Sequence, residues 1–133
     1  MDYRVLDIDK KLMQETIKAR ENAYAPISNF RVGAAILTES DEIIVGANVE
    51  ISSFSPTSCA ERNAIFSYFS GGGRHFTKIA ICGDDDNTFP CGVCRQVIYE
   101  LSPEAIVFIV NEDSSYKVFN IRELLPNGFR YEL

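Results

Sequence analysis

The chain has 133 residues, of which 46% are hydrophobic, so it has the length of one domain and enough apolar material for a core. Its formal net charge of −6 disfavours a nucleic-acid polymer as partner, because phosphate contacts need clustered lysine and arginine. The sequence has neither the run of about 20 apolar residues that a membrane span requires nor an apolar signal core near Met1. We therefore expect a single domain over residues 1–133, a cytoplasmic location and no membrane partner.

The first half of the chain is predicted to form a helix and a β-hairpin. Apolar residues recur every three or four positions from Asp9 to about Tyr24, which indicates an amphipathic helix that ends before Pro26. Two short apolar runs, at 32–37 and 43–47, flank a polar, turn-like segment and therefore predict a pair of antiparallel strands.

The second half alternates between helices and strands. The expected elements are a helix that starts near Thr57 or Ser58 and ends at Gly71–Gly73, a strand at Lys78–Cys82, a helix between Pro90 and Pro103, and a strand at Ala105–Val110. The order strand, helix, strand, helix, strand predicts parallel pairing through right-handed crossovers. The predicted fold is therefore α/β, with three α/β/α layers around a mixed five-stranded sheet, in which an N-terminal β-hairpin is followed by βαβαβ.

Four cysteines without a secretory signal are more typical of metal binding in the reducing cytosol than of disulfides. Three of them lie in two motifs, Cys59-Ala60-Glu61-Arg62 and Pro90-Cys91-Gly92-Val93-Cys94, and each motif falls at a predicted helix start. The free N–H groups and the positive dipole end of a helix stabilise thiolate, which is the form that binds zinc. The pattern therefore predicts that Cys59, Cys91 and Cys94 hold one Zn²⁺ per chain.

Three protein ligands are typical of a catalytic zinc site, because the fourth tetrahedral position stays free for a water molecule. Glu61 lies two residues after Cys59, near the metal but poorly placed to ligate it, so we expect it to move protons between that water and a substrate. Two alternatives stay open here: a closed zinc site with Cys82 as fourth ligand, and buried free cysteines without metal. Cys82 lies in an apolar strand and His75 follows three glycines, so neither position favours ligation.

Two arginines beside the motifs are candidates for tuning the charge of the site. Three thiolates give zinc a net charge of about −1, which makes a bound water a poor acid unless nearby cations withdraw charge. Arg62 and Arg95 each directly follow a motif element, so one or both are expected to donate hydrogen bonds to the sulfurs, with Arg62 preferred.

A ligand-x-Glu element followed by Pro-Cys-x-x-Cys is the pattern of zinc nucleobase deaminases, in which the glutamate is acid and base rather than ligand. Beyond these motifs the chain resembles the small cytidine deaminases at Ala23–Pro26, Ser28, Phe30, Val32–Ala35, Gly46, Asn48–Glu50, Thr57, Cys59–Arg62, Pro90–Gly92, Cys94–Val97, Glu123–Pro126 and Phe129. The resemblance implies zinc-dependent hydrolytic deamination of cytidine or 2′-deoxycytidine to uridine or 2′-deoxyuridine and ammonia, in pyrimidine salvage.

The resemblance also assigns contacts with a nucleoside. It implies that Phe30 stacks on the cytosine ring and that Ala60 belongs to the substrate site. It further implies that Asn48 and Glu50 bind a ribose hydroxyl. An amide together with a carboxylate suits vicinal hydroxyls, and the charge of the carboxylate repels a nucleotide phosphate. Without the resemblance, Phe30 can equally be a core residue and Asn48 a turn residue.

The C-terminal aromatic residue bears on assembly. Phe129 resembles the aromatic side chain that, in this family, enters the base pocket of a neighbouring subunit. The resemblance therefore implies a homo-oligomer, a homotetramer first and a dimer as the alternative. Packing of Phe129 on its own domain is the competing interpretation.

The chain departs from the family pattern at three places, which comprise four residues. Ile51, Phe54 and Ser55–Pro56 replace residues usual in the family around the sugar, so they put the fine specificity in doubt.

Two other functions compete with deamination of a nucleoside. A blasticidin S deaminase is the nearest rival, since residues 121–129 resemble that group. Those enzymes have a shorter segment before the first cysteine and no carboxylate that matches Glu50, which favours the nucleoside. A noncatalytic zinc-binding module is the third possibility, and Glu61 argues against it.

Overall fold

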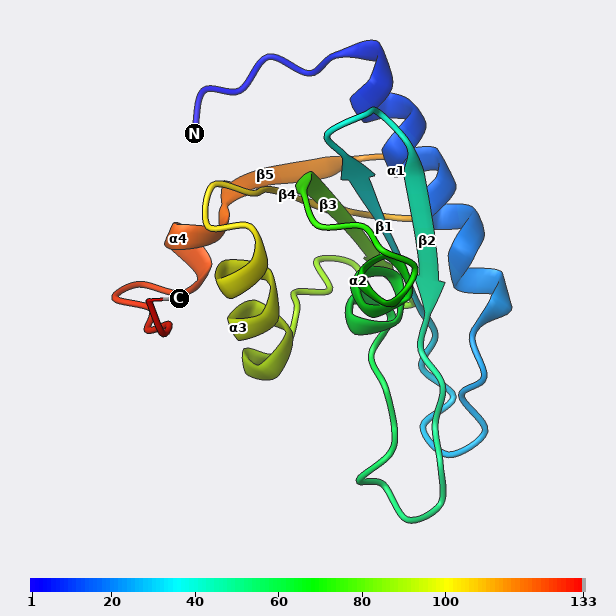
Figure 1. Ribbon diagram of the computed structural model, residues 1–133. Coiled ribbons are helices and arrows are strands. Elements are labelled where there is room, and N and C mark those ends of the chain that lie inside the picture. Colours follow the sequence, from blue (N-terminus) through cyan, green and yellow to red (C-terminus); the bar gives the residue numbers. More distant parts are fainter. Residues whose placement is uncertain (133) are drawn as a thin grey trace.

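The computed structural model describes residues 1–132 as an α/β fold (Figure 1). In chain order its elements are α1 (Asp7–Ala19), a 3₁₀ turn (Arg20–Asn22), β1 (Val32–Thr38), β2 (Ile43–Ala47), α2 (Ala60–Ser70), β3 (Phe76–Gly83), α3 (Gly92–Leu101), β4 (Ile106–Val110), β5 (Tyr116–Asn120) and α4 (Ile121–Leu124). Over this described range, no helix is both long enough and apolar enough to cross a membrane.

The strands form one mixed five-stranded sheet in the order β2-β1-β3-β4-β5, which confirms the predicted sheet. The directions of the paired strands differ in detail from the prediction that strands joined through a helix pair in parallel. β1 pairs antiparallel with both β2 and β3, β4 pairs antiparallel with β5, and β3 and β4 are parallel. β2 and β3 run in the same direction without pairing, because the crossover through α2 passes over β1.

Hydrophobic clusters on the two faces of the sheet produce three layers. Alternate residues of a strand point to opposite faces, so Ala34 and Ile36 of β1 pack with α2, α3 and α4, while Ala35 and Leu37 pack with α1. Figure 1 shows α1 on one side of the sheet and α2 and α3 on the other. The predicted α/β/α layering is confirmed.

The start of α2 lies slightly later than predicted and sets the position of the candidate site. Ser58 forms two backbone hydrogen bonds with Val49 instead of starting the helix, so Cys59 becomes the N-cap. A Cβ atom at Gly46 of β2 would lie 2.5 Å from the Ala60 carbonyl oxygen. The glycine therefore lets the first turn of α2 lie directly on the edge strand.

Two further boundaries differ from the sequence prediction. α1 ends at Ala19, earlier than expected, and the Tyr24 amide instead donates to the Asn48 carbonyl after β2. β5 and α4 are additional elements. Asn120 ends β5 and caps α4, because its side chain accepts a hydrogen bond from the Arg122 amide.

A buried ion pair holds α1 on the sheet. The fully buried Asp9 accepts a hydrogen bond from Lys78 Nζ at 2.6 Å, and its second oxygen accepts from the Tyr3 hydroxyl and the Leu6 amide. We expect Asp9→Asn to lower the free energy of unfolding by about 3 kcal/mol, because Lys78 loses its counter-charge. Urea unfolding measures this loss, with the exposed Asp7→Asn as control. Equal effects of both substitutions would contradict the importance of the pair.

Candidate functional site

The three predicted zinc ligands come together at two helix starts. Cys59 is the N-cap of α2, Cys91 is the N-cap of α3, and Cys94 lies in the first turn of α3. Their Sγ atoms all lie within 4.8 Å of one another, and those of Cys59 and Cys91 are 4.0 Å apart. Sulfurs bound to one tetrahedral zinc at about 2.3 Å lie about 3.8 Å from one another. The cluster therefore fits a zinc ion.

Cys82 and His75 lie apart from this cluster. Cys82 is buried with the α1 side of the sheet, and its thiol points to the Gly83 carbonyl oxygen at 3.8 Å. His75 is exposed just before β3. Within residues 1–132, the three-cysteine cluster is the one group of His, Cys, Asp and Glu side chains with metal-binding spacing. A closed site with Cys82 as fourth ligand is thus incompatible with the geometry.

The cluster stabilises a thiolate. A hydrogen bond from the Cys94 thiol and the nearby Arg62 guanidinium lower the pKa of Cys59 to about 5. The same hydrogen bond, together with burial, raises the pKa of Cys94. The Cys94 amide also donates to the Cys91 sulfur at 3.5 Å, as expected at a helix N-terminus. The surroundings of Cys59 therefore favour the thiolate, which is the form that zinc requires.

The two arginines have different partners. Arg62 Nη2 donates to the Cys59 sulfur at 3.1 Å, which is the contact expected of a charge-tuning side chain. Among the hydrogen bonds of residues 1–132, those of Arg95 go to carbonyl oxygens instead, from Nε to Pro90 at 2.8 Å and from Nη1 to Leu124 at 2.9 Å. The sulfur contact expected of Arg95 is therefore not formed, and its guanidinium ties the loop before α3 to α4.

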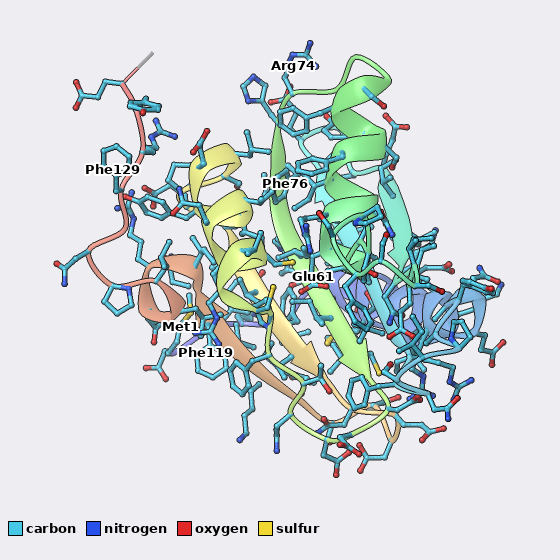
Figure 2. All side chains as sticks on the ribbon, turned by 90° about the horizontal axis from the view of Figure 1, so that it is seen from below. Met1, Glu61, Arg74, Phe76, Phe119 and Phe129 are labelled. Carbon is cyan, nitrogen blue, oxygen red and sulfur yellow. The ribbon has the colours of Figure 1, made fainter. Side chains whose placement is uncertain are left out.

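Glu61 lies in the first turn of α2, beside Cys59, with 4% of its surface exposed. Figure 2 shows its side chain in the interior of the molecule. Burial raises the pKa of this carboxyl group to about 7. A carboxyl group with such a pKa can both accept and donate a proton near neutral pH, which suits a general acid and base.

A pocket of about 360 Å³ opens at Glu61 and has the size of a small-molecule site. The predicted site residues that line it are Phe30, Asn48, Glu50, Cys59, Ala60, Glu61 and Cys91. Glu50 and Glu61 are its charged lining residues, and across the described residues 1–132 no lysine or arginine lines it. Seven of the residues singled out from the sequence therefore lie together around one pocket.

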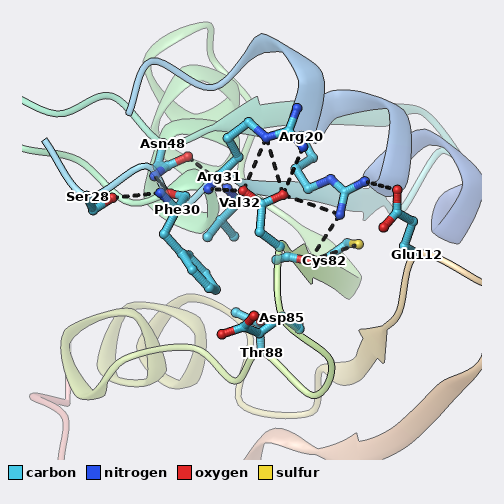
Figure 3. A network of polar contacts seen from close by, with 12 residues as sticks. Arg20, Ser28, Phe30, Arg31, Val32, Asn48, Cys82, Asp85, Thr88 and Glu112 are labelled. Atoms are coloured by element: carbon cyan, nitrogen blue, oxygen red, sulfur yellow. Dashed lines mark hydrogen bonds and ion pairs between the residues drawn. The ribbon is translucent and has the colours of Figure 1, made fainter. Parts of the chain in front are cut away.

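Asn48 and Glu50 hold the segment that carries Phe30, here called the Phe30 segment (residues 28–32). Asn48 accepts a hydrogen bond from the Val32 amide and donates to the Phe30 carbonyl, both at 2.9 Å (Figure 3). Glu50 accepts hydrogen bonds from the Ser28 hydroxyl and from two backbone amides of the same loop. These hydrogen bonds lower the pKa of the Glu50 carboxyl group. Both side chains therefore fix the pocket wall as well as lining it.

Sequence reasoning missed the wall formed by Thr88 and Phe89. The Phe89 ring packs on Phe119 with ring centres 5.4 Å apart, and the Arg95 guanidinium lies 5.9 Å from the Phe89 ring centre. The Phe30 ring points toward the loop that carries Thr88 (Figure 3). An aromatic residue directly before the Pro-Cys-x-x-Cys motif is the signal that could have indicated this wall.

Phe129 lies outside the pocket of its own chain as far as residues 1–132 define it. Its side chain is 67% exposed and packs against Tyr131, with ring centres 5.4 Å apart. Its carbonyl oxygen accepts a hydrogen bond from Gln96, which holds the segment after α4 (residues 125–132, here called the C-terminal arm) along α3. Figure 2 shows Phe129 at the periphery, away from Glu61. The ring is therefore free to contact another molecule.

Residues 6–110 match the family described as the cytidine and deoxycytidylate deaminase zinc-binding region. The chain belongs to this deaminase family. A cytidine deaminase of Halalkalibacterium halodurans is 43% identical over 123 residues, which cover 91% of this chain and 93% of that protein. A crystal structure of a cytidine deaminase from Burkholderia pseudomallei matches with a TM-score of 0.86 and 41% identity, over 90% of this chain and 97% of that one.

The deaminase family match has direct bearing on the site. The matched range contains Glu61 and all three clustered cysteines, whereas β5, α4 and the C-terminal arm lie beyond it. A cytidine deaminase structure from Mycobacterium tuberculosis, at 30% identity and a TM-score of 0.80 over 96% of this chain and all of that one, has the same fold. Both the expected zinc cofactor and the expected fold are thereby confirmed.

Proposed function

We propose that this deaminase converts cytidine and 2′-deoxycytidine, with water, to uridine and 2′-deoxyuridine and ammonia, a step of pyrimidine salvage. The observation that supports it most is a buried Glu61 carboxyl group beside three clustered cysteines, in a nucleoside-sized pocket with aromatic walls. The cytidine deaminases of H. halodurans and B. pseudomallei, each similar over about nine-tenths of the chain, support the same substrate.

Cys59, Cys91 and Cys94 would hold the zinc ion as three thiolates. When bound, zinc supplies a Lewis acid that makes a water molecule acidic near neutral pH. Arg62 donates to the Cys59 sulfur, so its positive charge withdraws electron density from the thiolates and offsets their excess negative charge.

Glu61 moves the two protons of the reaction. It takes one proton from the attacking water and delivers it to ring nitrogen N3, while the water oxygen bonds to C4. It then carries the second proton of that water to the exocyclic amino group, so the C4–N4 bond breaks and ammonia leaves. The water oxygen stays on C4, and one cytidine plus one water therefore gives one uridine plus one ammonia.

The rest of the pocket binds the base and the sugar. Phe30 stacks on the pyrimidine ring and Ala60 lines the floor beside Glu61. After its contacts with the Phe30 segment, Asn48 retains one N–H donor and Glu50 one acceptor lone pair for a sugar hydroxyl. The Glu50 carboxylate also repels a substrate phosphate, which favours a free nucleoside over a nucleotide or a polynucleotide.

Four substrates compared side by side test this function. Purified protein of known zinc content is incubated with cytidine, 2′-deoxycytidine, deoxycytidylate and blasticidin S, and the loss of the cytosine absorbance band is followed. We expect turnover of both nucleosides and far lower kcat/KM for the other two compounds. Absence of turnover with all four at full zinc content would favour a noncatalytic zinc module, and a preference for blasticidin S would favour the antibiotic deaminases.

We also propose that the deaminase acts in the cytoplasm as a homotetramer of single-domain subunits, in which Phe129 of one subunit closes the base pocket of another. The exposure of the Phe129 ring and the anchoring of its backbone by Gln96 support this role. Base stacking on an aromatic residue contributes about 1–3 kcal/mol. Light scattering on the purified protein distinguishes a tetramer from a dimer.

Phe129→Ala is expected to raise the KM for cytidine roughly tenfold, from the stacking free energy that it removes. Co-expression with Glu61→Gln tests whether the ring acts between subunits. In mixed oligomers, a Phe129→Ala subunit, whose Glu61 is intact, receives Phe129 from a Glu61→Gln neighbour. The activity at low cytidine should then exceed the sum of the activities of the two variants expressed separately. A strictly additive result would mean that Phe129 serves its own chain.

A further inference from the structure

The Phe30 segment is held from two sides, and one of these sides has no assigned role. Asn48 and Glu50 bind it from the segment after β2. On the other side lies Asp84, the first residue after β3 and the first of the acidic run Asp84–Asp86, a pattern typical of a solvated loop. Its carboxylate instead pairs with Arg31 and with the buried Arg20, and its side chain is 23% exposed.

Asp84 joins the Phe30 segment to the end of β3. Its Oδ2 accepts a hydrogen bond from the Arg31 backbone amide at 2.7 Å, and its own amide donates to the Arg31 carbonyl at 3.0 Å. The Arg31 guanidinium adds Nε and Nη2 contacts to both carboxylate oxygens, at 3.0–3.2 Å. These contacts extend the β1–β3 ladder by one residue, directly beside Phe30 (Figure 3).

Asp84 also neutralises a buried cation. Arg20, which is 5% exposed, lies with Nη1 3.6 Å from Asp84 Oδ1 and donates from the same nitrogen to the Gly83 carbonyl. Its Nη2 pairs with Glu112 in the turn between β4 and β5 at 3.1 Å. One carboxylate thus connects the end of α1, the end of β3 and the Phe30 segment. Arg20, Arg31 and Glu112 of this network are labelled in Figure 3.

This connection lies next to the pocket. After Asp84 the chain continues to Thr88 and Phe89, which line the pocket, and the Phe30 ring points toward the loop that carries Thr88 (Figure 3). The end of that loop returns close to its start, because a Cβ atom at Gly83 would lie 2.2 Å from the Thr88 hydroxyl oxygen. Asp84 therefore lies at the point where the two walls of the pocket diverge.

We propose that Asp84 is a positioning residue for the pyrimidine ring: by binding the Arg31 amide at the end of β3, it fixes the gap between the Phe30 wall and the Thr88–Phe89 wall. The proposal rests on the proposed function, because that gap is where the base would bind. In the described part of the chain, the hydrogen bonds and ion pairs of the Asp84 carboxylate run to Arg31 and Arg20, not to Glu61 or the clustered cysteines.

Asp84→Asn tests the proposal, since its amide nitrogen would face the donors of Arg31 and Arg20. The expected result is an increase of about tenfold in the KM for cytidine, with kcat within about twofold of the parent protein and one zinc still bound per chain. This is the kinetic pattern expected when a substitution weakens binding of the ground state and the transition state equally. Glu112→Gln is the matched control, because it removes the other carboxylate on Arg20 without touching the Phe30 segment. It is expected to leave KM unchanged.

A double-mutant cycle shows whether Asp84 acts through Phe30. In a Phe30→Ala background, Asp84→Asn is expected to leave KM unchanged, because the ring that it positions is absent. If Asp84→Asn does not fold, Asp84→Glu keeps the charge beside Arg20 while its extra methylene displaces the carboxylate from the Arg31 amide, so KM should still rise.

Three results would overturn the proposal: an unchanged KM in a folded Asp84→Asn or Asp84→Glu protein, an equal rise of KM in Glu112→Gln, or full additivity with Phe30→Ala. A parent protein that does not deaminate cytidine would instead overturn the proposed function. The two failures are therefore distinguished by the activity of the unsubstituted protein.

Discussion

Glu61→Gln should lower kcat for cytidine by about 10²–10⁴-fold while zinc stays bound at one ion per chain. Glutamine has the size and shape of the buried carboxyl group, so the substitution leaves the pocket filled. It cannot, however, accept a proton from water or deliver one to the base. The effect should therefore fall on kcat, with little change in the affinity for uridine.

Steady-state kinetics, zinc analysis and uridine binding on the same preparation separate these effects. Glu21→Gln is a matched control that changes one carboxylate to an amide elsewhere, at an exposed position of the 3₁₀ turn after α1. It should retain the kcat of the parent protein. Full turnover by zinc-loaded Glu61→Gln would contradict the assignment of Glu61 as the proton carrier.

Cys91→Ala should remove both the zinc and the activity. A tetrahedral site with one position left open for water depends on all three protein ligands, and two sulfurs do not hold the ion against dilution. Because Cys59 and Cys91 cap the helices that meet at the site, the thermal unfolding temperature should fall as well. Zinc analysis of protein purified without chelator, together with calorimetry, measures both changes.

Cys82→Ala is the matched control for loss of a cysteine. Its sulfur is buried on the other side of the sheet and makes one weak contact, with the Gly83 carbonyl. This variant should keep one zinc per chain and the parent kcat, at a small cost in stability from the cavity. Loss of zinc from Cys82→Ala, or its retention by Cys91→Ala, would require a different ligand set.

Each half of the ligand set can be recognised from local sequence, whereas the pairing of the two halves in one site follows from the known deaminase pattern. Cys59 and Cys91 are N-caps, and a helix start can be recognised from a few neighbouring residues. Glu61 follows from its spacing to Cys59 on the same helix turn. The β2 bounds at 43–47 are also predicted without error, because a polar turn and alternating apolar runs define a hairpin.

The features that the sequence did not reveal depend on long-range contacts. The position of β1 between β2 and β3 is decided by packing of α2 across the hairpin, which neighbouring residues do not encode. Arg95 bonds to the carbonyl of Leu124, 29 positions later, instead of to a sulfur that lies near it in sequence. The inward turn of Asp84 is similar, since its partner Arg31 lies 53 positions earlier.

The contacts of Asn48 and Glu50 bear on any redesign of the proposed sugar preference. Both side chains bind the loop that carries Phe30, so a substitution there chosen to admit an arabinoside or another sugar analogue would also move the Phe30 ring. Thr57 lines the same pocket, and its hydroxyl bonds to the backbone of Ile51 instead of to the Phe30 segment. Variation at Thr57 is therefore expected to change the proposed sugar site without moving the Phe30 segment.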